Sequence, residues 1–101
     1  MAGKPETALQ RRIQEALERL GIWVIPMAVT GKRSNRSVRT GERGMPDLWT
    51  EHGWLEVKLP GNDLDPDQVT WHEKAKKRGV RVAMVTCEME AIQQALAWMA
   101  S

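Results

Sequence analysis

The chain of 101 residues has the size of one small domain, and its 42% hydrophobic and 28% charged residues are typical of a folded globular protein rather than a disordered one. Its single cysteine, Cys87, excludes an internal disulfide and a cysteine-based zinc site and fits a reducing, cytoplasmic setting, while no apolar run approaches the ~20 residues of a membrane-spanning helix. The net charge of +2 is uneven, because residues 1–44 carry a net +5 and residues 45–101 a net −3. We therefore expect the first part to face a polyanion and the second to concentrate carboxylates, as a divalent-metal site does.

A helix, a short strand and a basic loop are expected in the first 44 residues. Apolar side chains recur every three or four positions over Pro5–Leu20, which predicts a helix that ends at Gly21. The short apolar run Ile22–Ile25 predicts a strand. Val29–Gly44 shows no periodicity and predicts a basic loop, whose cations are Lys32, Arg33, Arg36, Arg39 and Arg43.

Two short strands are predicted next, at Asp47–Thr50 and Trp54–Leu59. The connection between them, residues 51–53, contains a glycine, as hairpin turns commonly do. Side chains alternate along a strand, so Glu56 and Lys58 share one face of the second strand and most of its apolar side chains share the other.

The last 40 residues predict a helix, a strand and a closing helix. Asp65 and Gln68 have the spacing of a capping box, and the helix that they begin is expected to run to about Arg78. Val80–Thr86 is β-branched and predicts a strand. Glu88–Met99 predicts a helix, with the inward residues Met89, Ile92, Leu96 and Met99. The whole order is αβββαβα, in which a hairpin precedes a strand–helix–strand crossover, and it predicts a mixed sheet with helices on both faces.

Three charged residues around the predicted hairpin form the candidate catalytic site. Glu56 and Lys58 lie two apart on one strand face, roughly 6.7 Å between Cα atoms, and Asp47 begins the partner strand. Two carboxylates held in this way offer oxygen ligands to Mg²⁺, which prefers one or two carboxylates plus water and substrate phosphate. Lys58 adds a positive charge that can orient a metal-bound water or help to deprotonate it. The pattern predicts metal-dependent hydrolysis of a phosphodiester.

Each of these features also has a purely structural interpretation. Asp47 can be a simple turn acid, and Glu56 with Lys58 a solvated strand face, because an acid two residues before a lysine is common at this composition. The basic loop can be solvated surface. We interpret His72 as a structural or phosphate-contacting residue rather than a metal ligand, and the five tryptophans as packing residues rather than ligand-stacking ones.

The motifs together resemble the PD-(D/E)XK nuclease superfamily and, more narrowly, the virus-type replication-repair nuclease (VRR-NUC) domain in its stand-alone phage form. They are Gly44-Met45-Pro46-Asp47 before the hairpin, Glu56-Val57-Lys58 in its second strand, and Gln68 at the start of a helix. The resemblance spans residues 1–101 as a single domain. It implies an α/β fold with a restriction-endonuclease-like αβββαβ core, a mixed sheet flanked by helices, and a C-terminal helix.

The resemblance implies a Mg²⁺- or Mn²⁺-dependent DNA endonuclease. In that family pattern Asp47, Glu56 and the backbone carbonyl of Val57 bind the metal, and Lys58 is the catalytic lysine. Glu6 matches the acid of the first helix, which contacts the metal or its waters, although an acid in a first helical turn also suits the helix dipole. Gln68 matches a glutamine near the site and can complete the capping box as well.

The resemblance also implies partners. Small single-domain members are similar to phage-encoded homodimers that act on four-way (Holliday) junctions, so branched DNA, a second copy of the chain and the cytoplasm of a bacterial or phage-infected host cell are expected. The basic residues of Gly31–Arg43 follow no family pattern, and their assignment to phosphate contacts rests on charge and on an irregular loop's ability to become ordered on a phosphate backbone.

Two other functions stay open. The chain can be a non-catalytic DNA-binding module on the same scaffold, although such a module does not need Asp47, Glu56 and Lys58 to converge. It can also be the nuclease subunit of a larger repair or packaging complex, inactive alone, with its tryptophans forming part of a partner surface.

Overall fold

The structure is a computed structural model that describes residues 5–27 and 42–101. In these ranges the elements are α1 (Pro5–Arg19), β1 (Val24–Pro26), β2 (Leu48–Thr50), β3 (Gly53–Val57), α2 (Pro66–Lys77), β4 (Val82–Val85) and α3 (Glu88–Ala100). The predicted order αβββαβα is confirmed, with shorter strands than expected. The predicted basic loop lies outside the described residues except for its last three positions. None of the helices in the described ranges is long and apolar enough to cross a membrane.

The four strands form one mixed sheet in the order β1-β2-β3-β4. β2 pairs antiparallel with both β1 and β3, whereas β3 and β4 are parallel and are connected through α2. Thr50 fixes the hairpin turn between β2 and β3. Its hydroxyl donates to the Gly53 carbonyl at 2.7 Å and accepts the backbone N–H groups of His52 and Gly53, each at 3.0 Å.

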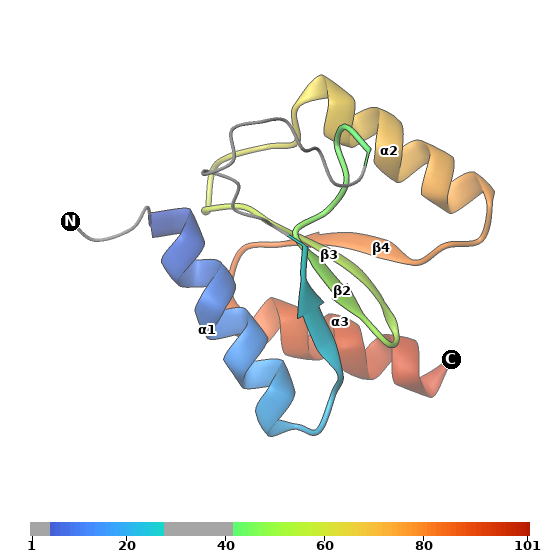
Figure 1. The fold of residues 1–101 in the computed structure, drawn as a ribbon. Coiled ribbons are helices and arrows are strands. Elements are labelled where there is room, and N and C mark those ends of the chain that lie inside the picture. The colour runs from blue at the N-terminus through green and yellow to red at the C-terminus, as the bar shows by residue number, and fades with distance from the viewer. Residues whose placement is uncertain (1–4, 28–41) are drawn as a thin grey trace.

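The helices cover both faces of the sheet, as predicted: α1 and α3 pack together on one face, and α2 lies over the other (Figure 1). The apolar core lies between the sheet and the α1–α3 pair. Leu55 and Val57 of β3 are fully buried in it, together with Ile13 and Leu17 of α1. Arg12 of α1 and the first residue of α3 add an exposed ion pair at 3.2 Å across the helix pair.

The prediction for the buried face of α3 is wrong for three of its four residues, since Ile92 is partly buried and packs against the core. Met89, Leu96 and Met99 are 59%, 50% and 50% exposed, and the buried residues of α3 are Ala91 and Ala95. Apolar residues form two stripes along this helix, and periodicity alone does not select between them. The alanine stripe is the inward one because small side chains allow α3 to approach α1 and the sheet closely.

Candidate active site

The carboxylates of Asp47 and Glu56 lie together at the edge where β2 begins and β3 ends. Leu48 pairs with Leu55 across the hairpin, so the next positions outward, Asp47 and Glu56, are cross-strand neighbours. The Asp47 carboxylate accepts the Val57 N–H at 2.8 Å, which fixes its orientation beside β3. The structure therefore brings together the two acids that the sequence singled out.

The Glu56 carboxyl is buried, with 1% of the residue exposed. Burial raises the pKa of Glu56 to about 9, and the neighbouring Asp47 carboxylate and the charge of Glu6 act in the same direction, while the positive charge of Lys58 opposes them. Glu56 therefore holds a proton at neutral pH unless a cation offsets the paired carboxylates. A solvated strand face, the structural interpretation of Glu56, is excluded by this burial.

Gln68 performs both of the functions considered for it. Its side-chain oxygen accepts the Asp65 N–H at 2.9 Å, and the Asp65 carboxylate accepts the Gln68 N–H at 2.9 Å, which completes the capping box of α2. Its amide nitrogen donates to Glu56 Oε2 at 3.1 Å. One side chain thus anchors the start of α2 and orients the buried carboxyl.

His72 lies one turn further along the same face of α2 and is buried against Glu56. Its Nε2 is 3.5 Å from Glu56 Oε1, too long for a hydrogen bond, and among the described residues neither atom has a hydrogen-bond partner. Burial and the charge of Lys76 lower the pKa of His72, so the imidazole is neutral and the contact is not an ion pair. At 5% exposure His72 fits the structural interpretation better than a phosphate contact. Its four-residue spacing from Gln68 was the sequence signal for this shared face.

Lys58 and Glu6 approach the same carboxyl from different elements. Lys58 follows β3 directly, and its N–H donates to the Val85 carbonyl at 3.1 Å. Glu6 lies in the first turn of α1 and is partly buried. The charge of Glu6 raises the pKa of Glu56 and that of Lys58 lowers it, so both residues lie within electrostatic range of the acid pair.

Gly44 explains the glycine in the Gly-x-Pro-Asp motif. Its φ is +79°, and a Cβ at this position would overlap the backbone carbonyl of Asp67 in the first turn of α2. Only glycine therefore lets this segment lie against α2 as it approaches Asp47. Exposed ion pairs accompany the contact, from Arg43 to Asp67 at 3.8 Å and from Glu42 to Lys74 at 3.5 Å.

The predicted phosphate-binding residues are only partly placed. Arg43 is exposed and pairs with Asp67, as described above. The remaining predicted members of this set lie outside the described residues; they are Lys32, Arg33, Arg36 and Arg39.

The carboxylates of Asp47 and Glu56 suit Mg²⁺ better than a structural zinc ion. Among residues 5–27 and 42–101, no group of three or more His, Cys, Asp or Glu side chains is arranged to hold a metal ion. A structural zinc site, which takes four protein ligands, does not fit. Mg²⁺ does fit, because it needs one or two carboxylates and fills its remaining positions with water and substrate phosphate. The unpartnered Oε1 of Glu56 is a free ligand atom for such an ion.

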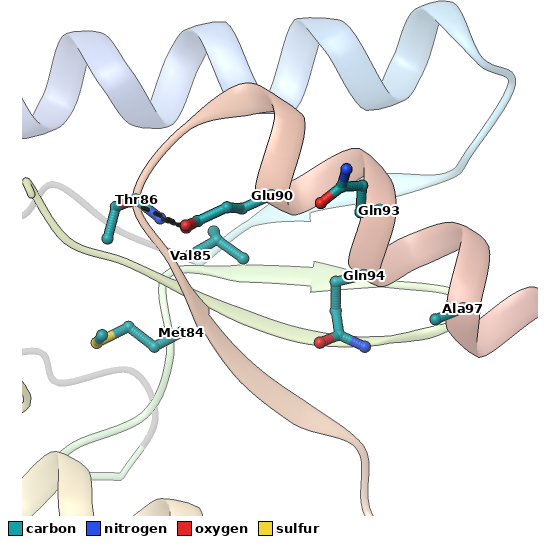
Figure 2. Close-up of a pocket in the computed structure, with 7 residues that line it drawn as sticks. All are labelled: Met84, Val85, Thr86, Glu90, Gln93, Gln94 and Ala97. Carbon is teal, nitrogen blue, oxygen red and sulfur yellow. Dashed lines mark hydrogen bonds between the residues drawn. The ribbon is translucent and has the colours of Figure 1, made fainter.

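A hollow lies between β4 and α3 (Figure 2), and two of its residues, Met84 and Val85, are the strand partners of Glu56 and Val57 in β3. Its lining residues are Met84, Val85, Thr86, Glu90, Gln93, Gln94 and Ala97. The Glu90 carboxylate already accepts the backbone N–H and the hydroxyl of Thr86, at 2.6 and 2.9 Å. These lining residues include no cation, and the hydroxyl of Thr86 and the carboxylate of Glu90 are bonded to each other, so the hollow offers no second catalytic site.

Comparison with known proteins supports the sequence-based resemblance. A solved structure described as "VRR_NUC domain" is 27% identical to this chain and superposes with a TM-score of 0.66, covering 90% of this chain and 94% of the other. Neither a protein-family model nor a curated protein sequence matches the chain. The likeness confirms the VRR-NUC resemblance and the restriction-endonuclease-like fold class, and it gives the chain a nuclease-type fold.

Proposed function

We propose that this VRR-NUC-like domain is a metal-dependent DNA endonuclease in which Asp47 and Glu56 bind Mg²⁺ or Mn²⁺. The observation that carries the proposal is the buried Glu56 carboxyl beside Asp47, an arrangement that is electrostatically unfavourable until a cation joins it. The likeness to a VRR-NUC structure supports a nuclease-type reaction.

The residues around the reacting phosphate have different functions: some bind the metal and others orient water or offset charge. When bound, a divalent cation supplies Lewis acidity and lowers the pKa of a coordinated water. Asp47 is held for coordination by the Val57 N–H, and Gln68 holds one oxygen of Glu56 so that the other stays free. The Val57 carbonyl is the third proposed protein ligand. Lys58 orients the attacking water and offsets the negative charge that develops on the phosphate oxygens, and Glu6 orients water at the rim.

The finer features of the proposal come from the family resemblance. Branched DNA, with four-way junctions foremost, is the proposed substrate, and a homodimer in the cytoplasm of a bacterial or phage-infected cell is the proposed active form. The basic residues Lys32, Arg33, Arg36, Arg39 and Arg43 are proposed to contact phosphates.

A nuclease subunit of a larger complex is the second candidate. The observation in its favour is the exposed apolar stripe of α3 formed by Met89, Leu96 and Met99, which is available to a partner chain. The binding-module alternative is less favoured, because a buried carboxyl beside a second acid costs stability and contributes nothing to phosphate binding.

Cleavage of a substrate panel tests the proposal. Four-way junction, flap, duplex and single strand are incubated with Mg²⁺, with Mn²⁺ and with a chelator, using wild type and Asp47→Asn. We expect cleavage by wild type only, in metal only, and fastest on the junction. Binding without cleavage of any substrate in either metal contradicts the proposal and favours the binding module, while light scattering on the same sample reports whether the chain is a dimer.

A further inference from the structure

The last turn of α2 carries a concentrated positive charge that the acid pair does not use. Lys74, Lys76 and Lys77 lie in this turn and Arg78 is the C-cap; the four cations are called here the α2 basic cluster, and all are exposed. Lys74 has a loose ion pair with Glu42 at 3.5 Å. Among the described residues no acid lies within ion-pair distance of the other three.

The α2 basic cluster has more positive charge than is needed to complement the dipole of its helix. One or two cations in a last helical turn favourably complement the negative end of the helix dipole. Glu73 precedes the cluster on the exposed surface of α2, but neither Lys76 nor Lys77 forms an ion pair with it. Four cations close together repel one another, and a polyanion relieves that repulsion. By contrast, the nearby Arg81 guanidinium is already engaged, since it donates to the Trp98 carbonyl and the Ser101 hydroxyl at 2.8 and 2.7 Å.

The cluster points away from the protein. His72 and Ala75 are the buried residues of α2, and Lys74 and Lys77, three positions apart, share the opposite side of the helix. Lys76 lies nearer the sheet, where its charge acts on the buried imidazole of His72. Lys77 is therefore free to meet a large ligand without movement of the core, and Lys74 can do so on leaving its exposed ion pair with Glu42.

The helix sets the separation between the cluster and the acid pair along its own axis, and the width of the helix adds to it for Lys74 and Lys77, which lie on the side away from Glu56. Gln68 touches Glu56 in the first turn of α2, and the helix runs from there toward the start of β4 (Figure 1). Lys77 lies nine positions further along, which is about 14 Å at about 1.5 Å per residue. Base pairs in a duplex rise about 3.4 Å each, so this distance corresponds to about four base pairs.

We infer that the α2 basic cluster binds the phosphate backbone of a duplex DNA arm about four base pairs from the phosphate that is cut. The inference rests on the proposed nuclease function and sharpens it, because it requires the substrate to present a duplex arm on this side. A duplex is stiff over such a short distance, so phosphates at both ends of α2 are held at a fixed spacing.

A matched pair of double variants tests the inference. Lys77→Gln with Arg78→Gln removes two cluster charges and leaves Lys76, which lies near His72, in place. Arg11→Gln with Arg19→Gln removes two exposed charges from α1, on the other face of the sheet. Duplex affinity is measured in a chelator over a range of salt concentrations. We expect the cluster variant to bind roughly ten-fold more weakly at 0.1 M salt and to lose about two units of salt slope, and the α1 variant to change by less than half a unit.

A second measurement locates the contact on the DNA. Duplexes with a single neutral methylphosphonate are compared at each position from two to seven nucleotides from the cut. Wild type should be weakened most near the fourth position, and this local effect should disappear in the cluster variant.

Each outcome separates this inference from the proposed function. If wild type cuts DNA but the two double variants bind alike, or the methylphosphonate profile is unchanged in the cluster variant, the inference is overturned and the nuclease function stands. If the cluster variant loses affinity and salt slope while the α1 variant does not, but wild type cuts nothing, the duplex contact of the cluster stands and the proposed reaction fails. A wild type that binds neither a duplex nor a four-way junction overturns both.

Discussion

The two faces of the β-sheet are built from side chains of opposite character. Leu55 and Val57 of β3 point into an apolar core beneath α1 and α3, among other buried apolar side chains. Glu56, the residue between them, points to the other face, where it meets Gln68 and His72 of α2. β3 thus contributes to the apolar core on one side of the sheet and presents on the other a buried carboxyl with one oxygen that lacks a hydrogen-bond partner. Neighbouring residues of β3 should therefore respond to substitution in opposite ways.

Removing an acid from the polar face should have the largest effect. Asp47→Ala should lower cleavage by at least about 10³-fold, because the cation loses one of its two carboxylates and with it several kcal/mol of transition-state stabilisation. The free energy of unfolding and the affinity for DNA should stay close to those of wild type. Single-turnover cleavage in Mg²⁺ measures the loss, and a rate near that of wild type would remove Asp47 from the site.

Shortening a side chain on the apolar face should act on stability instead. Leu55→Ala leaves a cavity in the core and should lower the free energy of unfolding by about 3 kcal/mol. Leu96→Ala makes the same change on the exposed stripe of α3 and should cost under about 1 kcal/mol. Urea unfolding compares the two. Equal losses would mean that Leu96 is covered in solution, for example by a second copy of the chain.

Substitution of Lys58 distinguishes stabilisation of charge from coordination of the metal on the polar face. Lys58→Ala should lower turnover by about 10²-fold while the metal still binds, because the lysine orients water and offsets charge without ligating the ion. Titration calorimetry with Mn²⁺ checks the binding. A loss of metal affinity as large as that in Asp47→Ala would show that the two residues do not have distinct functions.

The smallest predicted effect is a pH dependence confined to the polar face. The pKa of Glu56 is raised from 4.5 to about 9, so between these values the folded protein holds a proton that the unfolded chain has released. Stability without metal should therefore fall as pH rises from 7 to 9. This window lies above the range in which His72, whose pKa is lowered, affects folding.

The control for this pH dependence is Glu56→Gln, which keeps the shape of the side chain and removes its titration. Its free energy of unfolding, from urea unfolding in a chelator, should change less between pH 7 and 9 than that of wild type. An equally steep fall in both proteins would assign the pH dependence to other groups.

The neighbourhood of Asp47 and Glu56 could be predicted because it depends on local rules. Strand alternation and a short turn between the strands are enough to bring the two acids together. The capping box of Gln68 was predictable for the same reason, since its partners are three residues apart.

The burial of the site could not be predicted in this way. Whether Glu56 is solvated depends on α2 packing over β3, a contact between distant parts of the chain, and the raised pKa of Glu56 follows from that packing. The buried face of α3 could not be predicted for a related reason. Its alanine stripe and its methionine–leucine stripe are both apolar, and packing against α1 and the sheet decides between them. The need for Gly44 likewise appears only when the first turn of α2 is in place.

A divalent cation completes the pair formed by the buried Glu56 and the half-buried Asp47, and counting protons tests this central claim most directly. Mn²⁺ is titrated into wild type and Asp47→Asn at pH 7.5 by calorimetry, in two buffers of different ionisation enthalpy. Because Glu56 is protonated at this pH without metal and must be ionised to bind it, wild type should release about one proton per ion bound. Asp47→Asn should bind the ion much more weakly. Binding without proton release, or with an affinity unchanged by Asp47→Asn, would contradict the account.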